Sequence, residues 1–521
     1  MSNPQVESLK ESRSWSETIR LFAKKEVITM LFLGFSAGIP ILLLFSPLSL
    51  WLGEAGIERS TVTYFSWAAL GYSFKFLWSP LVDQLPLPFL TKYFGRRRSW
   101  MLFSQLLVIT AILLIGSVDP SISDSHVVYM AVAVVMLGFS SATQDTVIDA
   151  YRIEIAHLDL QTLMASAYIA GYRIGMITAG AGSLILAQIF GSSVESYSYA
   201  AWQSTYYVMA LIMFIGVATT FIISEPEQSK ILRKKFNNKQ YSKFVLLFAM
   251  CVTVFILSYI GLADFVSQSK SILSELINNK VFAGLLLEAG RLIVCLASAV
   301  IFVMFVSKTP LYEQELVEET YIHPIKDFFQ RYGIKVAFLI LLFVGFYRIS
   351  DIVLGVIALV FYQDMGFTKI EIAAATKTFG LIMTILGGFL GGLLSAKYGV
   401  MRILFLGAVL VVVTNLLFVL LAKAGHNITL LYVVISADNL SGGIATTAFM
   451  AYLASLTNIS FTAVQYAIFS SLMTLIPKTI GGYSGTIVDA IGYENFFIVA
   501  SAMGLPVLII LYFVKKNMTK I

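Results

Sequence analysis

The stretch that decides the fold reads Phe139-Ser-Ser-Ala-Thr-Gln-Asp-Thr-Val-Ile-Asp-Ala-Tyr-Arg-Ile-Glu154, at the end of an apolar run that begins near Val127. A run of this length is typical of a transmembrane helix. It nevertheless carries Asp145 and Asp149, whose spacing of four residues puts both carboxylates on one face of a helix. A carboxylate in the hydrocarbon core costs about 2.5–3.5 kcal/mol. The pattern therefore predicts a membrane helix whose acids face water, a partner charge or a cargo.

The composition places the whole chain among polytopic membrane proteins. Of its 521 residues, 58% are hydrophobic and 13% are charged, and the mean hydropathy is +0.82. An average soluble protein carries about 25% charged residues. Both cysteines lie in apolar runs, so neither a disulfide framework nor a metal site is expected, and no cofactor is expected. We interpret the net charge of +6 as a topology signal, and nucleic acid is not an expected partner.

Fourteen apolar segments are long enough to cross a bilayer, which predicts an all-α fold. They are 27–50, 61–83, 100–117, 127–151, 163–190, 202–224, 243–264, 281–307, 334–362, 370–395, 401–422, 429–455, 462–487 and 495–514. If both termini are cytoplasmic, most of the 36 lysines and arginines fall on the cytoplasmic side, as the positive-inside rule requires.

Two loops carry the same signature. The first reads Pro80-Leu-Val-Asp83 and continues at Gly95-Arg-Arg-Arg98, and the second lies within 391–402, with Ala396 where the acid belongs. Both resemble the Gly-x-x-x-Asp-Arg-x-Gly-Arg-Arg signature of the major facilitator superfamily. Parallel repeated halves are the hallmark of that transporter fold.

The repeat predicts how the chain is divided. Spans four and twelve align as Asp145–Tyr151 against Thr446–Tyr452. We expect a cytoplasmic tail over 1–26, a six-helix bundle over 27–224, linkers with two extra helices over 225–333, and a second six-helix bundle with a short tail over 334–521. Spans one, four, nine and twelve would line a central cavity. In the extra pair, Glu288 and Arg291 are expected to pair with each other.

Several segments also resemble the AmpG family of muropeptide permeases. In chain order they are Gly34–Pro40, Phe74–Leu81 with Asp83, Gly95–Trp100, Ser141–Asp145 with Asp149, Gly171–Met176, Lys377–Gly380, and Asp438–Gly443 followed by Thr446–Phe449. The match runs in order over both six-span halves and is weakest over 225–330.

This resemblance implies a proton-driven importer of anhydromuropeptides, which are N-acetylglucosaminyl-anhydro-N-acetylmuramyl peptides. It would act as a monomer in the inner membrane of a Gram-negative bacterium, in peptidoglycan recycling linked to β-lactamase induction and antibiotic resistance. Eukaryotic acetyl-CoA transporters are distant relatives of the family, so another anionic cargo such as acetyl-CoA is the alternative. A membrane glycosyl- or acyltransferase is disfavoured, because the chain has no long extramembrane loop with clustered acids or histidines. An enzyme is therefore not expected.

Three acids are candidates for proton coupling: Asp145, Asp149 and Asp351. The alternative for the first two is a structural pair bound by Arg173 and Arg152. Asp351 lies three residues after Arg348, so these two side chains either pair or separate to serve a proton and a cargo carboxylate.

The candidate cargo-binding side chains are polar or basic groups within predicted spans: Lys75, Gln144, Arg173, Arg348, Lys377, Asp438, Asn439 and Thr446. An arginine can hold a peptide carboxylate with two parallel hydrogen bonds, while amides and hydroxyls suit sugar hydroxyls. The alternative is that the cations neutralise nearby acids, with Lys75 serving Asp145 or a helix end.

The first signature loop supplies a candidate gate made of Asp83, Arg96, Arg97 and Arg98. Its expected role is conformational, because loop charges would hold the cytoplasmic side closed in one state.

Overall fold

The computed structural model describes residues 15–518 except 59–60, 63–64, 66–69, 158–159, 194–195, 228–235 and 278–279. In this part of the chain every regular element is a helix. Thirteen helical segments are long and apolar enough to cross a membrane, and they match thirteen of the fourteen predicted spans. The remaining predicted span, 61–83, includes undescribed residues. Its described part contains α5 (Leu70–Phe74), the 3₁₀ turn η4 (Lys75–Leu77) and α6 (Ser79–Gln84).

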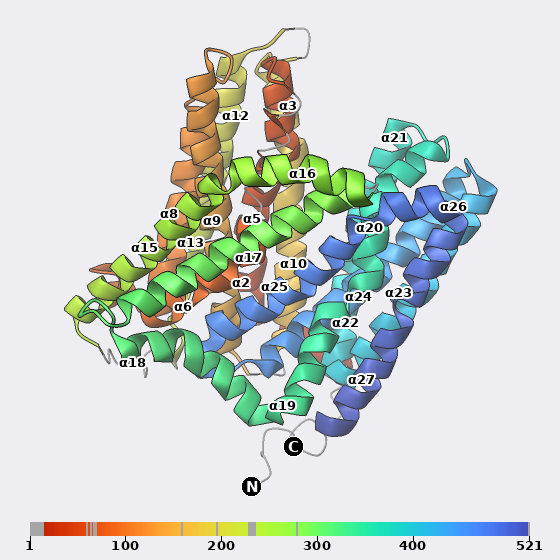
Figure 1. Cartoon of the computed structure of the whole chain (residues 1–521). Helices are drawn as coiled ribbons and strands as arrows, with labels where there is room; N and C mark the ends of the chain where they lie inside the picture. The colour runs from red at the N-terminus through yellow and green to blue at the C-terminus, as the bar shows by residue number, and fades with distance from the viewer. Residues whose placement is uncertain are drawn as a thin grey trace. The chain divides into compact units, whose positions relative to one another are not determined.

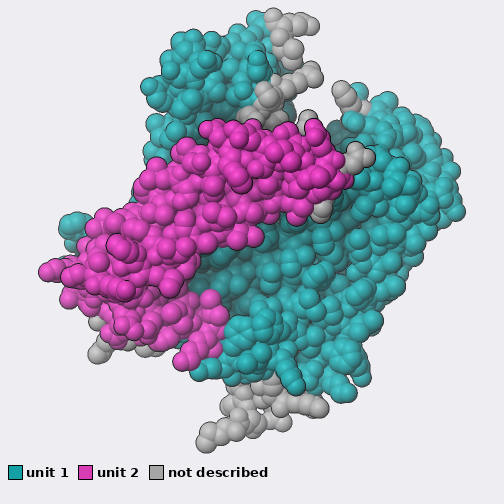
Figure 2. Space-filling view, in the orientation of Figure 1, with its two compact units in different colours: residues 1–232, 328–521 teal, residues 233–327 magenta. Residues whose placement is uncertain are grey.

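The chain forms two compact units, residues 1–232 with 328–521 and residues 233–327 (Figure 2). The first unit contains both signature loops, and Figure 1 labels many of its helices. Besides α5, η4 and α6, its N-terminal half contains α1 (Trp15–Arg20), η2 (Leu21–Ala23), α2 (Lys25–Leu43), α3 (Ser46–Glu54), α7 (Leu90–Phe94), α8 (Arg96–Gly116), α9 (Asp124–Ile155), α10 (Gln161–Ile177), the π turn η6 (Thr178–Gly182), α11 (Ser183–Ile189), α12 (Tyr199–Ile212) and α13 (Phe214–Ile222).

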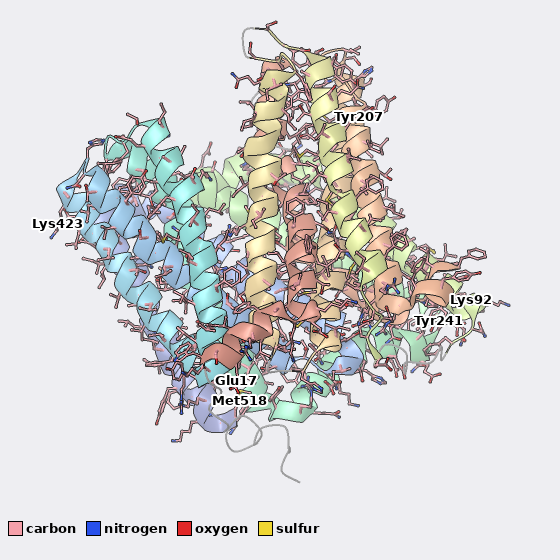
Figure 3. All side chains as sticks on the ribbon, turned by 180° about the vertical axis from the view of Figure 1, so that it is seen from behind. Glu17, Lys92, Tyr207, Tyr241, Lys423 and Met518 are labelled. Atoms are coloured by element: carbon pink, nitrogen blue, oxygen red, sulfur yellow. The ribbon has the colours of Figure 1, made fainter. Side chains whose placement is uncertain are left out.

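The C-terminal half has the same all-helical character. It contains α19 (His323–Phe346), α20 (Ile349–Asp364), α21 (Lys369–Ile372), the π segment η8 (Ala373–Phe379), α22 (Gly380–Tyr398), α23 (Val400–Ala424), α24 (Ile428–Leu456), η9 (Ile459–Phe461), α25 (Thr462–Gly481), α26 (Ser484–Ala502) and α27 (Leu505–Met518). Figure 3 places Glu17 of α1 and Met518 of α27 at the same end of this unit.

The two signature loops share a backbone feature. Gly95 immediately precedes α8 with φ 82°, and Gly399 immediately precedes α23 with φ 89°. A side chain strains the backbone in this region, which glycine adopts freely. The repeat seen in the sequence is therefore also a repeat of local structure.

Glycines bring α2 and α10 together backbone to backbone. A Cβ atom added to Gly38 would lie 2.1 Å from the carbonyl oxygen of Tyr172, and one added to Gly171 would lie 1.9 Å from that of Leu31. Small residues permit such close approach between membrane helices. This contact gives a packing role to two of the AmpG-like segments, Gly34–Pro40 and Gly171–Met176.

Each half has a hydrophobic core of its own. One cluster of buried side chains draws only on residues from Ile39 to Val217. The other draws on the C-terminal half and, among the described residues, includes Ile153 as its one buried member from the N-terminal half. Cores that are almost separate allow the halves to move as bodies, because such motion leaves most buried contacts intact.

The second unit is a helical hairpin. It contains α15 (Asn238–Gly261), α16 (Ala263–Ile277), α17 (Lys280–Val306), α18 (Gln314–Val317) and the π turn η7 (Glu318–Ile322). Arg291 pairs with Glu288 at 3.4 Å, which confirms the pairing predicted from their spacing. The Arg291 guanidinium also lies over the Tyr259 ring, 3.6 Å from its centroid.

Candidate functional site

A buried ion cluster, which we call the latch, joins the two halves. It consists of Asp83, Arg97, Glu154 and Thr462. Arg97 is completely buried, and its Nη2 atom donates to Asp83 Oδ1 (2.6 Å), Glu154 Oε1 (2.5 Å) and Thr462 Oγ1 (2.8 Å). The Thr462 hydroxyl also donates to Glu154. Since Thr462 begins α25, side chains of the N-terminal half are bonded directly to a helix of the other half.

Asp83 adds a second contact at the same place. Its carboxylate accepts hydrogen bonds from the backbone N–H groups of Ala463 (3.2 Å) and Val464 (3.0 Å). These groups lie in the first turn of α25, where free N–H groups and the helix dipole favour an anion. The latch therefore holds the N-terminus of α25 against the loop that carries the first signature.

The four predicted gate residues do not all belong to the latch. Arg96 donates to the Asp83 carbonyl oxygen and lies 3.7 Å from the Glu154 carboxylate. Arg98 lies apart from the latch, because it donates to the carbonyl oxygens of Thr220 and Phe221 at the end of α13, both at 3.0 Å. Sequence reasoning gave no role to Glu154, although it ends the decisive stretch, or to Thr462.

A second cluster surrounds Asp149. Lys75 lies 3.8 Å from its carboxylate and Arg152 lies 3.4 Å from it. Arg152 is completely buried and also donates to the Tyr466 hydroxyl of α25 (2.9 Å) and to Gln161 (3.2 Å). Asp149 is thus neutralised by two cations. Arg152 is one partner that the sequence proposed, whereas Lys75 had been predicted to bind cargo, with Asp145 or a helix end as its alternative partner.

Asp145 has a different environment from Asp149. Its side chain is buried, and in the described part of the chain it accepts one hydrogen bond, from the Tyr168 hydroxyl at 3.3 Å. Lys75 interacts with Asp145 electrostatically, but among the described residues its ion pair is formed with Asp149. A buried carboxylate without an ion pair is costly, and that cost favours binding of a proton or a cation.

Gln144 makes a contact between two helices of the N-terminal half. It is fully buried, and its Nε2 atom donates to the Ser36 hydroxyl of α2 at 2.6 Å. The amide therefore joins α9 to α2 within the N-terminal half. The assignment of Gln144 to cargo binding stays a prediction, and its Oε1 atom has no hydrogen-bond partner among the described residues.

A third cluster lies where the chain breaks between α19 and α20. Arg348 and Asp351 form an ion pair there, which is the i,i+3 alternative that the sequence left open. Asp438 of α24 interacts electrostatically with both residues. Arg173 of α10 also interacts with both, so the cluster contains charges from the two halves.

Lys478 was not among the predicted cargo residues, yet it adds a further positive charge near Arg348. It follows Pro477 within α25, and its side chain is exposed. The signal in the sequence was its position: it is a lysine in an apolar span without an acid beside it.

The remaining predicted cargo residues fall into two groups. Asn439 accepts a hydrogen bond from Thr384 of α22 (2.9 Å) and donates to the Ile435 carbonyl oxygen (3.0 Å), so its amide links two helices. Lys377 is exposed in the π segment η8, and Thr446 is half-buried on α24. π segments interrupt regular helices and are frequent at functional sites.

Comparison with known proteins agrees with this architecture. The family described as Major Facilitator Superfamily matches residues 27–352 and 336–520. Putative transporter AmpG 4 of Rickettsia felis is 30% identical over 498 residues, which cover 96% of this chain and 98% of the relative. The anhydromuropeptide permease of Escherichia coli K12 is 26% identical over 504 residues, 96% of this chain and 82% of the relative.

Solved structures show the same fold. The proton:xylose symporter XylE bound to 6-bromo-6-deoxy-D-glucose aligns over 96% of both chains, with a TM-score of 0.58 and 10% identity. A bacterial homologue of the iron transporter ferroportin, in an outward-facing state, aligns over 94% of this chain and 99% of its own, with a TM-score of 0.56 and 12% identity. At these identities the likeness concerns the fold alone.

Proposed function

Because the chain belongs to the Major Facilitator Superfamily and, within it, to the AmpG family of transporters, we propose that it imports anhydromuropeptides with protons. The cargo moves from periplasm to cytoplasm across the inner membrane for peptidoglycan recycling, and this supply links the protein to β-lactamase induction. The observation that supports the proposal most strongly is the charged cluster of Arg173, Arg348, Asp351 and Asp438.

The cluster matches the chemistry of a sugar-linked peptide. Two arginines from opposite halves, Arg173 and Arg348, can each hold a peptide carboxylate with paired hydrogen bonds. A carboxylate bound by Arg348 competes with Asp351 for the guanidinium, so cargo binding releases an acid that can take a proton. Lys377 and Thr446 lie in the C-terminal half, as Arg348 does, and offer further contacts to carboxylate and hydroxyl groups of the cargo.

Asp145 supplies the proton site on the N-terminal side. When cargo arrives and excludes water, the buried carboxylate takes up a proton, because the charged form then loses its solvation. Asp149 instead forms ion pairs with Lys75 and Arg152. The two acids of the decisive stretch therefore have different roles, one in coupling and one in structure.

The latch controls access to the site. We divide the chain into two moving bundles, 27–224 and 334–521, with the extra helices between them in sequence. With both termini in the cytoplasm, the latch closes the cytoplasmic side, and its opening releases cargo inward. The separate cores of the two halves support this rocking motion.

Uptake into proteoliposomes tests the proposal. We expect a labelled anhydromuropeptide to accumulate when the outside is acidic, and acetyl-CoA in excess not to compete. Asp145→Asn keeps the shape and removes the titration, so accumulation should be lost while exchange at equal pH partly survives. Asp149→Asn is the comparison, and it should instead reduce folded yield, because it removes the carboxylate that forms ion pairs with both Lys75 and Arg152.

Two outcomes would contradict these assignments. Accumulation by Asp145→Asn in response to the proton gradient would exclude Asp145 as the coupling site and direct attention to Asp351. Equal uptake of acetyl-CoA would exclude muropeptide specificity while leaving transport itself intact.

A further inference from the structure

The first turns of α25 make contacts with two different parts of the chain. The latch binds their N-terminal end, where Asp83 accepts from the Val464 N–H group. The second contact comes from residues 328–332, which precede Gly333, where α19 is broken (φ 71°, ψ 155°). The ring of Phe328, which is 4% exposed, lies 5.2 Å from the ring of Phe469 on α25, centroid to centroid. These residues all belong to one compact unit.

Arg331 joins this segment to the ends of two helices. Its Nη1 atom donates to the carbonyl oxygen of Leu456 (3.1 Å), the last residue of α24. Carbonyl groups at a helix C-terminus lack intrahelical partners, and the helix dipole favours a cation there. Its Nη2 atom donates to Oε1 of Gln465 on α25 (2.9 Å). One guanidinium therefore binds both sides of the corner between α24 and α25.

Gln465 carries this contact to the backbone that the latch uses. Its side chain is 2% exposed, and its Oε1 atom also accepts from the backbone N–H of Asn458 (2.7 Å), in the turn that connects the two helices. Gln465 directly follows Ala463 and Val464, whose N–H groups bind Asp83. The side chain that fixes the corner thus lies one residue beyond the groups that the latch holds.

The corresponding corner of the N-terminal half, between α9 and α10, uses the same two residue types. The amide nitrogen of Gln161 donates to the carbonyl oxygens of Arg152 (2.9 Å) and Ala156 (3.1 Å), and its Oε1 atom accepts from Arg152 Nη1 (3.2 Å). That arginine belongs to α9, which is part of the corner. In the C-terminal half the arginine comes from another segment, so the position of that segment affects the corner.

We propose that residues 328–332 form a brace that positions the N-terminus of α25 for the latch, with Arg331 as the positioning residue. The inference rests on the proposed role of the latch in closing the protein. Because Gly333 interrupts the helix, the brace can shift without the span that follows it. The brace also connects the extra helices to the latch through the chain itself, since residue 328 directly follows the unit that contains them.

Alkylation of a buried cysteine in the full-length protein tests the brace. Cys251 and Cys295 are first replaced by alanine, and Ser166→Cys then reports opening, because Ser166 is buried where Gly392 of the other half packs against it. We expect Arg331→Gln to raise the alkylation rate several-fold, since it removes the charged donor of both hydrogen bonds. Lys335→Gln is the matched control. It removes the same charge from an exposed position of α19 beyond the break, and the rate should stay unchanged.

A double variant separates a brace from a residue that only supports the fold. Arg331→Gln combined with Glu154→Gln should react no faster than the faster of the two single variants, because the brace acts through an intact latch. Trp15→Ala provides the comparison, since the Trp15 ring contacts Lys397 on α22 and not the latch. Combined with Arg331→Gln, it should multiply the two rate ratios, as independent sites do.

Two results would overturn the proposal. The first is an equal rate in Arg331→Gln and Lys335→Gln, which would show that the brace does not affect closure. The second is a multiplied rate in the variant that combines Arg331→Gln with Glu154→Gln, which would show that Arg331 acts independently of the latch. Variants are compared after gel filtration shows a single folded species, and Arg331→Lys, with an intermediate rate expected, replaces Arg331→Gln if that variant does not fold. The assay needs no cargo, so failure of muropeptide uptake would be seen separately.

Discussion

Single residues were predictable where the decisive contact is local. The pair Glu288–Arg291 was predicted from its i,i+3 spacing on a helix, and Arg348–Asp351 is one of two alternatives that the same spacing left open; both pairs form. Glu154 received no role, because its partners Arg97 and Thr462 are 57 and 308 residues away. A single sequence, read without aligned relatives, shows the chemistry of a side chain. It does not show which distant element that side chain will contact.

Glu154→Gln tests the latch at the residue scale. The change removes one of the two carboxylates that neutralise the completely buried Arg97. Breaking a buried ion pair on one side costs about 3–5 kcal/mol, and here the cost falls on the closed state. We expect faster alkylation of Ser166→Cys, a buried position that packs against Gly392 of the other half, in a background without native cysteines.

The control for this change is Glu225→Gln. Glu225 accepts hydrogen bonds from the backbone N–H groups of Arg97 (2.8 Å) and Arg98 (3.0 Å), all within the N-terminal half. Its loss should leave alkylation at residue 166 near the starting rate. If both variants open the protein equally, the effect belongs to the arginine loop as a whole and not to the contact between the halves.

At the scale of elements, hydropathy predicted the spans well because bilayer thickness fixes their length. It did not predict what lies at their ends. Residues 1–26 were expected to form a short cytoplasmic helix or tail, but their contact with the other half was not predicted: α1 and η2 pack on α22. The Lys397 ammonium lies 3.6 Å from the centroid of the Trp15 ring, and the rings of Phe22 and Phe389 are 5.3 Å apart.

Trp15→Ala tests whether this contact helps to close the protein. Lys397 follows Ala396, the position at which the second signature loop lacks its acid, so the aromatic ring offers this loop a contact to the opposite half. A cation–π pair at an exposed site contributes about 0.5–1 kcal/mol. We expect alkylation of Ser166→Cys to rise about twofold to fivefold, the same energy expressed as a rate ratio.

Ile19→Ala provides the matched control on the same short helix, because Ile19 is 57% exposed. It should not change the alkylation rate. An unchanged rate in Trp15→Ala would show that α1 only rests on α22 and does not stabilise the closed state.

At the scale of the whole molecule, the repeat predicted two similar halves, because both signature loops need a glycine before an entering helix. Gly95 and Gly399 meet that need with φ 82° and 89°. The contacts between the two halves could not be predicted from the sequence. They depend on Arg152 reaching Tyr466 and on Asp83 reaching the start of α25, and both contacts arise only once the two bundles are placed together.

The last prediction concerns the direction in which the whole molecule crosses the membrane. Ser123 precedes α9 and Asn237 precedes α15, and both are exposed. Three candidate spans lie between them, Asp124–Ile155, Gln161–Ile189 and Tyr199–Ile222, so the two positions must lie on opposite sides. The basic residues at 96–98 and 239–243 favour the cytoplasm for the side that holds Asn237. In a background without native cysteines, a membrane-impermeant maleimide added to intact cells with a permeabilised outer membrane should therefore label Ser123→Cys and not Asn237→Cys. Disrupting the inner membrane should expose Asn237→Cys to the same reagent, which controls for reactivity. The reverse labelling pattern would show that the protein has the opposite orientation in the membrane. The latch would then lie on the periplasmic side, and its opening would release cargo outward instead of inward.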